Sequence, residues 1–337
     1  MQNFHFRVAL YIKKMMNMKY SLLLSFLAIS VVLGCKLDSS TSVNKGSTSN
    51  ETNLKKVEAV TLLGDTLYSY SKQSELLLDN YYLAKDEYER DPSNADAIIW
   101  YGRRVAYMGR YREAIDIFAE AIEKHPDDAR MYRHRGHRYI SIREYDKAIE
   151  DLEKACELIR DQKNEIEADG IPNEKGIPIS TLHGNIYYHL ALAYYLKDDL
   201  NNALRVYDLS MATEENDDNI VSTGHWKYMT LRRLGYHDEA ERMMKSVKGG
   251  MEIIENVTYY EMCLFYKGIL KEEWFDKKLS GNANNEVFLY GLANWQLYER
   301  KDSIKAKSYI DKLLSTGSKA SFAFLAAEAD YKRLFSE

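Results

Sequence analysis

Apolar residues recur at three- and four-residue steps along the segment YREAIDIFAEAIEKH, residues 111–125. At these steps Ala114, Phe118 and Ala121 fall on one side of an α-helix. A preceding segment, residues 95–108, is predicted to form a second helix, joined to the first by a turn that begins with a glycine. The pattern therefore predicts a pair of helices connected by a short turn.

The same landmarks return 34 residues later in the chain. The recurring positions are Gly102 and Gly136, Tyr111 and Tyr145, Ala114 and Ala148, Ala121 and Ala155, and Pro92 and Pro126. This period, with a small residue, an aromatic residue and two alanines in fixed order, resembles the tetratricopeptide repeat. The resemblance is strong over residues 92–158 and weaker over the rest of 56–334.

The resemblance implies an all-α fold, a right-handed tetratricopeptide-type α-solenoid of antiparallel helix pairs over residues 56–337. Its clearest repeats span 95–128 and 129–162. The period breaks at 161–180, which predicts an insertion loop that either decorates the surface or folds over a groove. The other expected elements are two helices of an eroded opening repeat at 56–91, weaker repeats at 184–217, 221–250 and 287–318, a helix with a degenerate partner at 257–279, and a capping helix at 320–334.

An apolar run of thirteen residues, 21–33, follows Lys19 near the start of the chain. The run is too short to span a bilayer comfortably and has the length of a signal-peptide core. It ends in the sequence VLGC, which resembles the lipobox of bacterial lipoproteins. The resemblance implies a cleaved signal peptide at 1–34 and a lipidated Cys35. The alternative is an ordinary secretory signal with an incidental cysteine.

Residues 35–55 are rich in serine, threonine and asparagine, and this composition predicts a flexible tether. Lys36 follows the cysteine, where an aspartate tends to retain Gram-negative lipoproteins at the inner membrane. The resemblance therefore favours an anchor in the outer membrane, with the chain facing the periplasm or the cell surface. The true first residue is left open among Met1, Met15, Met16 and Met18.

The charge distribution limits the kinds of molecule that the chain is expected to bind. The chain carries a net charge of −5, and its first 34 residues hold four basic groups and no acidic one, which leaves −9 for the rest. An acidic body argues against general binding to nucleic acid, which requires a basic footprint. Cys156 and Cys263 lie in apolar helical stretches about three repeats apart, so we expect free thiols.

In the tetratricopeptide family the first helix of each pair lines the concave surface. The matching residues of this chain are mostly arginine, histidine, tyrosine and tryptophan. The candidate groove residues are Arg103, Tyr107, Arg130, Arg133, His137, Tyr188, Tyr195, His225, Trp226 and Arg232. Arginine binds carboxylates with two parallel hydrogen bonds, so such a groove favours an acidic peptide or a C-terminus. The alternative is that these arginines pair with acidic residues of adjacent repeats.

Neither a metal site nor an active site is expected. His134 and His137 are three residues apart on a predicted helix, but three arginines surround them and would repel a cation. The chain contains no HExxH, GxSxG, Walker or GxGxxG motif. We therefore expect a protein that is not an enzyme and needs no cofactor.

Together these features predict a membrane-anchored scaffold for protein–protein interaction in the bacterial cell envelope. The alternative is a glycan-binding surface lipoprotein of a carbohydrate-uptake system, which Trp226 and Trp295 would serve as stacking platforms. A shallow platform of exposed aromatic rings would favour the glycan, and a continuous arginine-lined groove would favour the peptide.

Overall fold

The computed structural model describes residues 56–70, 73–213, 216–279 and 285–336. The predicted signal peptide, Cys35 and the tether lie outside these residues. The chain divides into two units, and the second comprises Lys55–Val247 with Glu252–Glu337. Every element named below belongs to the second unit. Within the described residues no helix combines the length and the hydropathy that a bilayer crossing requires.

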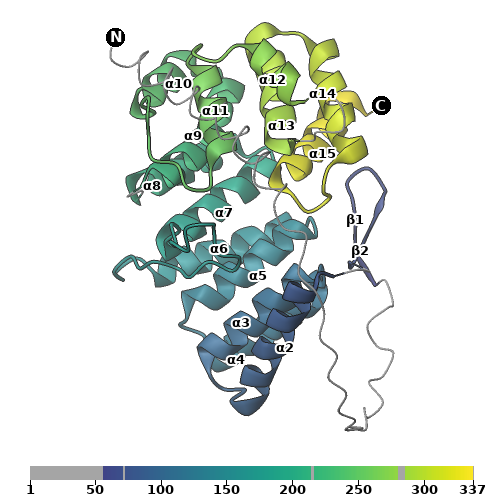
Figure 1. The fold of residues 1–337 in the computed structure, drawn as a ribbon, viewed down its shortest axis with the longest axis vertical. Helices are drawn as coiled ribbons and strands as arrows, with labels where there is room; N and C mark the ends of the chain where they lie inside the picture. The colour runs from purple at the N-terminus through teal and green to yellow at the C-terminus, as the bar shows by residue number, and fades with distance from the viewer. Residues whose placement is uncertain (1–55, 71–72, 214–215, 280–284, 337) are drawn as a thin grey trace, which may run out of the picture. The chain divides into compact units, whose positions relative to one another are not determined.

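The second unit is an all-α solenoid of the tetratricopeptide type, built from consecutive helices that pack side by side (Figure 1). Its helices in chain order are α2 (Glu75–Arg90), α3 (Ala95–Tyr107), α4 (Tyr111–Lys124), α5 (Ala129–Ser141), α6 (Tyr145–Leu158), α7 (Leu182–Leu196), α8 (Leu200–Thr213), α9 (Asp217–Leu234), α10 (His237–Met243), α11 (Val257–Tyr266), α12 (Glu272–Lys278), α13 (Glu286–Trp295), α14 (Ser303–Thr316) and α15 (Phe322–Phe335). A 3-10 turn, Met244–Ser246, follows α10, and a π-helical turn, Gln296–Arg300, follows α13.

The opening segment differs from the prediction of two helices at 56–91. It forms an antiparallel hairpin of β1 (Val57–Val60) and β2 (Thr66–Tyr68), followed by the single helix α2. Short runs of valine, threonine and tyrosine around a glycine favour strands and a turn over a helix. The buried Glu58 accepts a hydrogen bond from the backbone N–H of Arg112 (2.8 Å), which fixes the hairpin at the start of α4.

Local sequence signals place the starts and ends of the inner helices. Asn94 caps α3 and Asp128 caps α5, each accepting a backbone N–H of the first turn. The chain reverses after α3 at Gly109, whose φ of 73° suits glycine. At the same point after α5 the chain uses Arg143, with φ of 67°, although a side chain is strained there.

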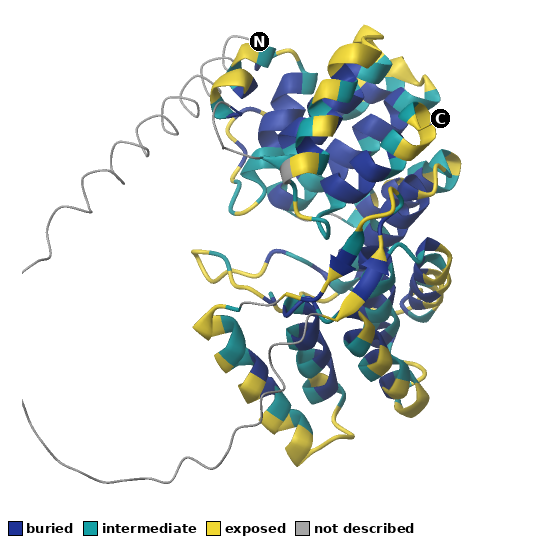
Figure 2. Cartoon of the chain, turned by 90° about the vertical axis from the view of Figure 1, so that its right-hand side faces the viewer, coloured by how far each residue is buried: buried dark blue, intermediate teal, exposed yellow. Residues whose placement is uncertain are grey.

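The core lies between facing helices, where Figure 2 shows the buried residues in dark blue. Gly102 of α3 faces Phe118 of α4, and a Cβ at Gly102 would lie 2.5 Å from the Cζ of that ring. Phe118 is only 1% exposed, so a Cβ at Gly102 would have to displace the ring within the core.

We expect Gly102→Ala to lower the free energy of unfolding by about 1–3 kcal/mol, because overpacking outweighs the better helix propensity of alanine. Gly224→Ala in α9 is the matched control. A Cβ there meets nothing closer than 3.8 Å, so we expect a gain of up to about 1 kcal/mol. Urea unfolding measures both variants, and equal effects would contradict the packing explanation.

The last helix, α15, does more than cap the final repeat. Its alanines face inward as expected, but it also packs on α7 and α13 (Figure 1). Glu328, which is fully buried, forms an ion pair with Arg143 (Nη2–Oε2 2.9 Å). Asp330 pairs with Arg233 of α9 and accepts a hydrogen bond from Tyr290 of α13. Helix α15 therefore joins elements that lie far apart in the sequence.

Candidate functional site

Six side chains of α3 and α5 converge around a small cavity, and we call them the basic cluster. On α5 the four residues are spaced so that they share one face of the helix, and on α3 the two residues are four apart. The cavity has a volume of about 90 Å³. The members of the cluster are Arg103, Tyr107, Arg133, His134, His137 and Arg138.

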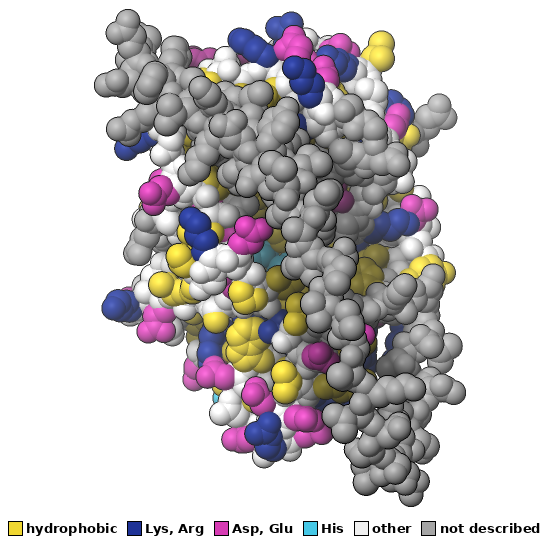
Figure 3. Space-filling model, in the orientation of Figure 1, with side chains coloured by type: hydrophobic (Ala, Val, Ile, Leu, Met, Phe, Trp, Pro, Cys, Tyr) yellow, Lys and Arg dark blue, Asp and Glu magenta, His cyan; other side chains and the backbone are white. Residues whose placement is uncertain are grey.

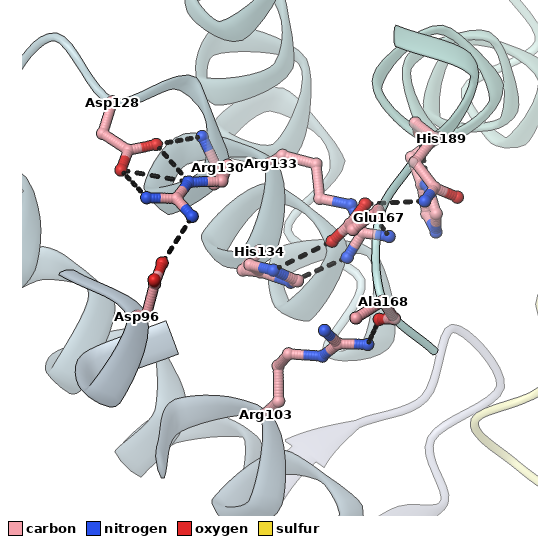
Figure 4. Close-up of polar contacts among 10 residues, drawn as sticks. Asp96, Arg103, Asp128, Arg130, Arg133, His134, Glu167, Ala168 and His189 are labelled. Carbon is pink, nitrogen blue, oxygen red and sulfur yellow. Dashed lines mark hydrogen bonds and ion pairs between the residues drawn. The ribbon is translucent and has the colours of Figure 1, made fainter. Parts of the chain in front are cut away.

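The insertion that follows α6 folds over this cluster, as Figure 4 shows. The carboxylate of Glu167 lies 3.3 Å from Nη2 of Arg133 and 3.2 Å from Nε2 of His134. Arg103 donates a hydrogen bond to the backbone carbonyl of Ala168 (3.0 Å). The sequence left open whether the insertion decorates the surface or folds over a groove. In the structure it folds over the basic cluster.

Backbone and side-chain contacts hold the loop in this position. The N–H of Glu167 donates to the carbonyl of Ser180 (2.9 Å), within a β-bridge between Ile166 and Thr181. Asn185 of α7 donates to the second carboxylate oxygen of Glu167 (2.7 Å). The acidic side chain is therefore held by α5 and α7 together.

Burial and neighbouring charges determine which side chains around the basic cluster carry a proton at pH 7. Burial lowers the pKa of His134 to about 3, with Arg133 adding to the effect, so the ring is neutral at pH 7. Arg133 donates to Nδ1 of His134 (2.7 Å), which places the ring proton on Nε2, facing Glu167. Burial acts to raise the pKa of Glu167, but Arg133, His134 and Arg103 outweigh it and hold that pKa well below its usual range.

An aromatic group adjoins the basic cluster. The rings of His137 and His189 lie 4.2 Å apart, and Phe322, the first residue of α15, lies 5.4 Å from His137. Tyr188 lies 6.2 Å from Phe322, measured between ring centres. Burial lowers the pKa of both histidines, to about 3 for His189, so both rings are neutral at pH 7. The start of α15 thus covers part of the predicted inner surface.

The structure brings five of the ten candidate groove residues together at the basic cluster and the aromatic group beside it. These five are Arg103, Tyr107, Arg133, His137 and Tyr188. Arg130 instead pairs with Asp128 and Asp96 at the edge of α5 (Figure 4).

The other four candidates lie apart from the basic cluster. Tyr195, His225 and Trp226 are each 1% exposed and are packed in the core, and of these three Tyr195 also lines a separate cavity of about 200 Å³. Arg232 donates to the Tyr228 hydroxyl (3.0 Å) and pairs with Glu299 (3.1 Å). Arg130 and Arg232 therefore pair with acidic residues, which was the alternative that the sequence left open.

The sequence reasoning missed Glu167, Arg138 and Phe322 as members of this region. The acidic run EIEAD in the insertion was a usable signal, because it follows directly after the repeats richest in inner arginines. On the face drawn in Figure 3, the visible acidic and basic side chains are interspersed. The visible part of that face therefore shows no wide basic patch.

The described part of the chain offers little support for a metal site or for a reactive cysteine. It contains no group of three or more histidines, cysteines, aspartates or glutamates placed to hold a metal ion. Cys156 and Cys263 are free. Burial raises the pKa of Cys156 to about 12 and that of Cys263 further, and such thiols are poor nucleophiles near pH 7.

Among known proteins, the match to a family is confined to one repeat. Residues 129–162 match the tetratricopeptide repeat family, and no curated protein matches the chain. Similar solved structures include a tetratricopeptide repeat protein from Parabacteroides merdae, with 14% identity over 75% of this chain and 92% of that one and a TM-score of 0.43. YrrB, described as a tetratricopeptide protein with an unusual peptide-binding site, has 16% identity over 72% of this chain and 96% of its own, with a TM-score of 0.40.

Similarities of this size do not identify a ligand. The 34-residue period and the family match over residues 129–162 carry the assignment. Members of this family generally use their helical surfaces to bind other proteins. Residues 129–162 are thus a tetratricopeptide repeat, and the chain has a helical solenoid fold of the kind that suits a protein–protein interaction scaffold.

Proposed function

We propose that this protein is a scaffold of the bacterial cell envelope that binds an acidic peptide segment of a partner at the basic cluster. One observation carries the proposal. The cluster already holds an acidic, extended segment, which is the chain's own Glu167–Gly170. The segment displays the chemistry that this surface accepts.

The contacts of the loop define the expected ligand. Arg133 and His134 face a carboxylate, while Arg103 and Arg104 donate to the backbone carbonyls of Ala168 (3.0 Å) and Gly170 (2.6 Å). A Cβ at Gly170 would lie 1.7 Å from the Tyr107 hydroxyl oxygen, so any side chain at that position would have to displace the Tyr107 ring, and glycine fits without this movement. The preferred segment is therefore a glutamate followed, three residues later, by glycine.

A partner must displace the loop before it binds. Because the loop is tethered, it competes at an effective concentration on the order of millimolar. Weakening the contact of Glu167 should therefore open the surface to a free peptide. Glu165, which is exposed on the same loop, offers a matched control.

The test uses a fluorescent peptide, KNEIEADGI, that copies residues 163–171. We expect the full chain with Glu167→Gln to bind it at least about tenfold more tightly than the wild type or Glu165→Gln, because one charge-assisted contact of the loop is lost. Adding Arg133→Gln to Glu167→Gln should abolish the gain. Fluorescence anisotropy measures the affinity. Equal binding by Glu167→Gln and Glu165→Gln, or equal binding of the peptide KNEIQADGI, would refute the proposal.

The cell-envelope part of the proposal rests on the apolar run and Cys35. We propose lipidation at this cysteine and an anchor in the outer membrane, favoured by Lys36 at the next position. The full chain should fractionate with membranes, and Cys35→Ser should move it to the soluble fraction. Unchanged fractionation would reject the lipid anchor and leave the peptide proposal intact. The glycan alternative has less support, because Trp226 is 1% exposed and Trp295 is half-buried, with its ring 4.9 Å from that of Phe265.

A further inference from the structure

The cavity of the basic cluster holds more positive than negative charge. Arg103, Arg133 and Arg138 line it, and Glu167 is the one enclosed carboxylate that faces them among the described residues. Counting the flanking Arg104 and the partly exposed Asp169 adds one charge of each sign. Two positive charges therefore remain without a counter-charge in the part of the chain that the structure describes. His134 and His137 do not change this balance, because both are neutral at pH 7.

Arg138 is the clearest unpaired group. No ion pair joins it to any residue that the structure describes, and its guanidinium lies 5.8 Å from the centre of the Tyr111 ring. Burial lowers its pKa to about 10, with Arg133 and Arg103 acting in the same direction. The group stays charged at pH 7 in a place where a positive charge is costly without a counter-ion.

Two further donors in the cavity lack acceptors. Arg103 is 9% exposed and Arg133 is 8% exposed, yet the Nε of each has no hydrogen-bond partner in the described part of the chain. Buried donors of this kind are rarely left unsatisfied. An acceptor oxygen placed in the cavity would satisfy them.

We propose that this cavity is a binding site for one small oxyanion, of the size of a phosphate or carboxylate group, held by the guanidinium groups of Arg103, Arg133 and Arg138. Arginine suits such a ligand because its planar fork matches oxyanion geometry. The cavity of about 90 Å³ has the volume of about three water molecules. It accommodates a single such group and excludes a nucleotide.

This inference is independent of the proposed peptide, since the charge surplus exists while the loop is in place. The bound oxyanion has two candidate sources, a free inorganic anion and a carboxylate group of a partner. The probes are therefore inorganic phosphate and acetate, each compared with sodium chloride at matched ionic strength. The protein is the full chain in mild detergent, and no peptide is added.

We expect phosphate, acetate or both to raise the melting temperature in a saturable manner, by about 5 °C at a hundredfold excess over Kd. Calorimetric titration should give one site per chain. A response to phosphate alone assigns a tetrahedral inorganic anion, and a response to acetate assigns a carboxylate. No saturable response to either anion overturns the proposal.

Substitutions separate a specific site from a general salt effect. Arg138→Gln and Arg103→Gln, on different helices, should each abolish the response. Arg130→Gln on α5 should retain it, because Arg130 pairs with Asp128 and Asp96 and does not line the cavity. In anion-free buffer, Arg138→Gln should melt no lower than the wild type, because it removes a half-buried charge that has no ion-pair partner among the described residues. A saturable response that persists in both cavity variants contradicts the proposal.

Discussion

Lowering the pH from 7 to 5 should remove up to about 6 kcal/mol from the free energy of unfolding, about 2 kcal/mol for each of three buried histidines. His134, His189 and His225 are 4%, 5% and 1% exposed, and burial is the main cause that lowers the pKa of each to about 3. In the unfolded chain a histidine titrates near pH 6.5. A loss of this size is comparable to the whole stability of an ordinary domain.

The sign follows from which state binds protons first. Below about pH 6.5 these histidines bind protons in the unfolded chain, whereas in the folded chain they bind protons only near pH 3. The free energy of unfolding therefore falls as the pH is lowered through that range. Burial raises the pKa of Glu58 and Asp151, whose protonation works in the opposite direction at lower pH. The range from pH 7 to pH 5 is therefore the most informative.

Urea unfolding at a series of pH values measures this slope. His225→Gln should reduce the average slope between pH 7 and pH 5 by about 1 kcal/mol per pH unit, the contribution of one histidine. His125→Gln is the control, because His125 lies near the surface at the end of α4. A wild-type stability that is flat between pH 7 and pH 5 would show that the buried rings are protonated in the folded chain.

Glu328→Gln should cost about 3–5 kcal/mol of stability, because it leaves a buried guanidinium without its counter-charge. The side chains of Arg143 and Glu328 are 3% and 0% exposed, and both the Nε and Nη2 of Arg143 donate to Glu328, at 3.1 and 2.9 Å. Glu328 also accepts the backbone N–H of Leu62 beside the β-hairpin. One buried carboxylate therefore serves two distant segments.

A double substitution tests whether the charge is the cause. Arg143→Gly with Glu328→Leu should recover much of the loss, because it removes both charges and the left-handed strain at Arg143. Asp311→Asn, which breaks the exposed pair with Lys307, should cost less than about 0.5 kcal/mol. Thermal or urea unfolding provides the measurement. A loss below about 1 kcal/mol for Glu328→Gln, or no recovery in the double variant, would contradict a buried ion pair.

The helix pairs of the two clearest repeats were predictable from the sequence because both repeats carry the same local signals at the same positions. Gly102 lies where two helices approach closely, and Asp128 caps the next helix, so short-range signals suffice for α3 to α6. The hairpin at 57–68 escaped because its strands are only four and three residues long. Runs of this length carry too little periodicity to distinguish strand from helix.

The candidate site was predictable only in part. Position rules carried over from the family assume an open inner surface, and they selected Arg103 and Arg133, which the structure places around one cavity. They failed for Tyr195, whose hydroxyl meets that of Tyr290 at 2.7 Å, and for Trp226, whose ring lies 5.8 Å from that of Tyr290. Helix α13 covers these positions. A period does not reveal which distant helices will meet.

The link between Arg143 and Glu328 also changes how this solenoid unfolds. In most repeat arrays each unit touches only its neighbours, so stability is nearly a sum of nearest-neighbour terms and the ends fray independently. Here a contact spans 185 positions of sequence and ties the last helix to the second repeat. We therefore expect the ends of this array to unfold together rather than to fray independently. Inserting or deleting one repeat between these positions would disturb the contact.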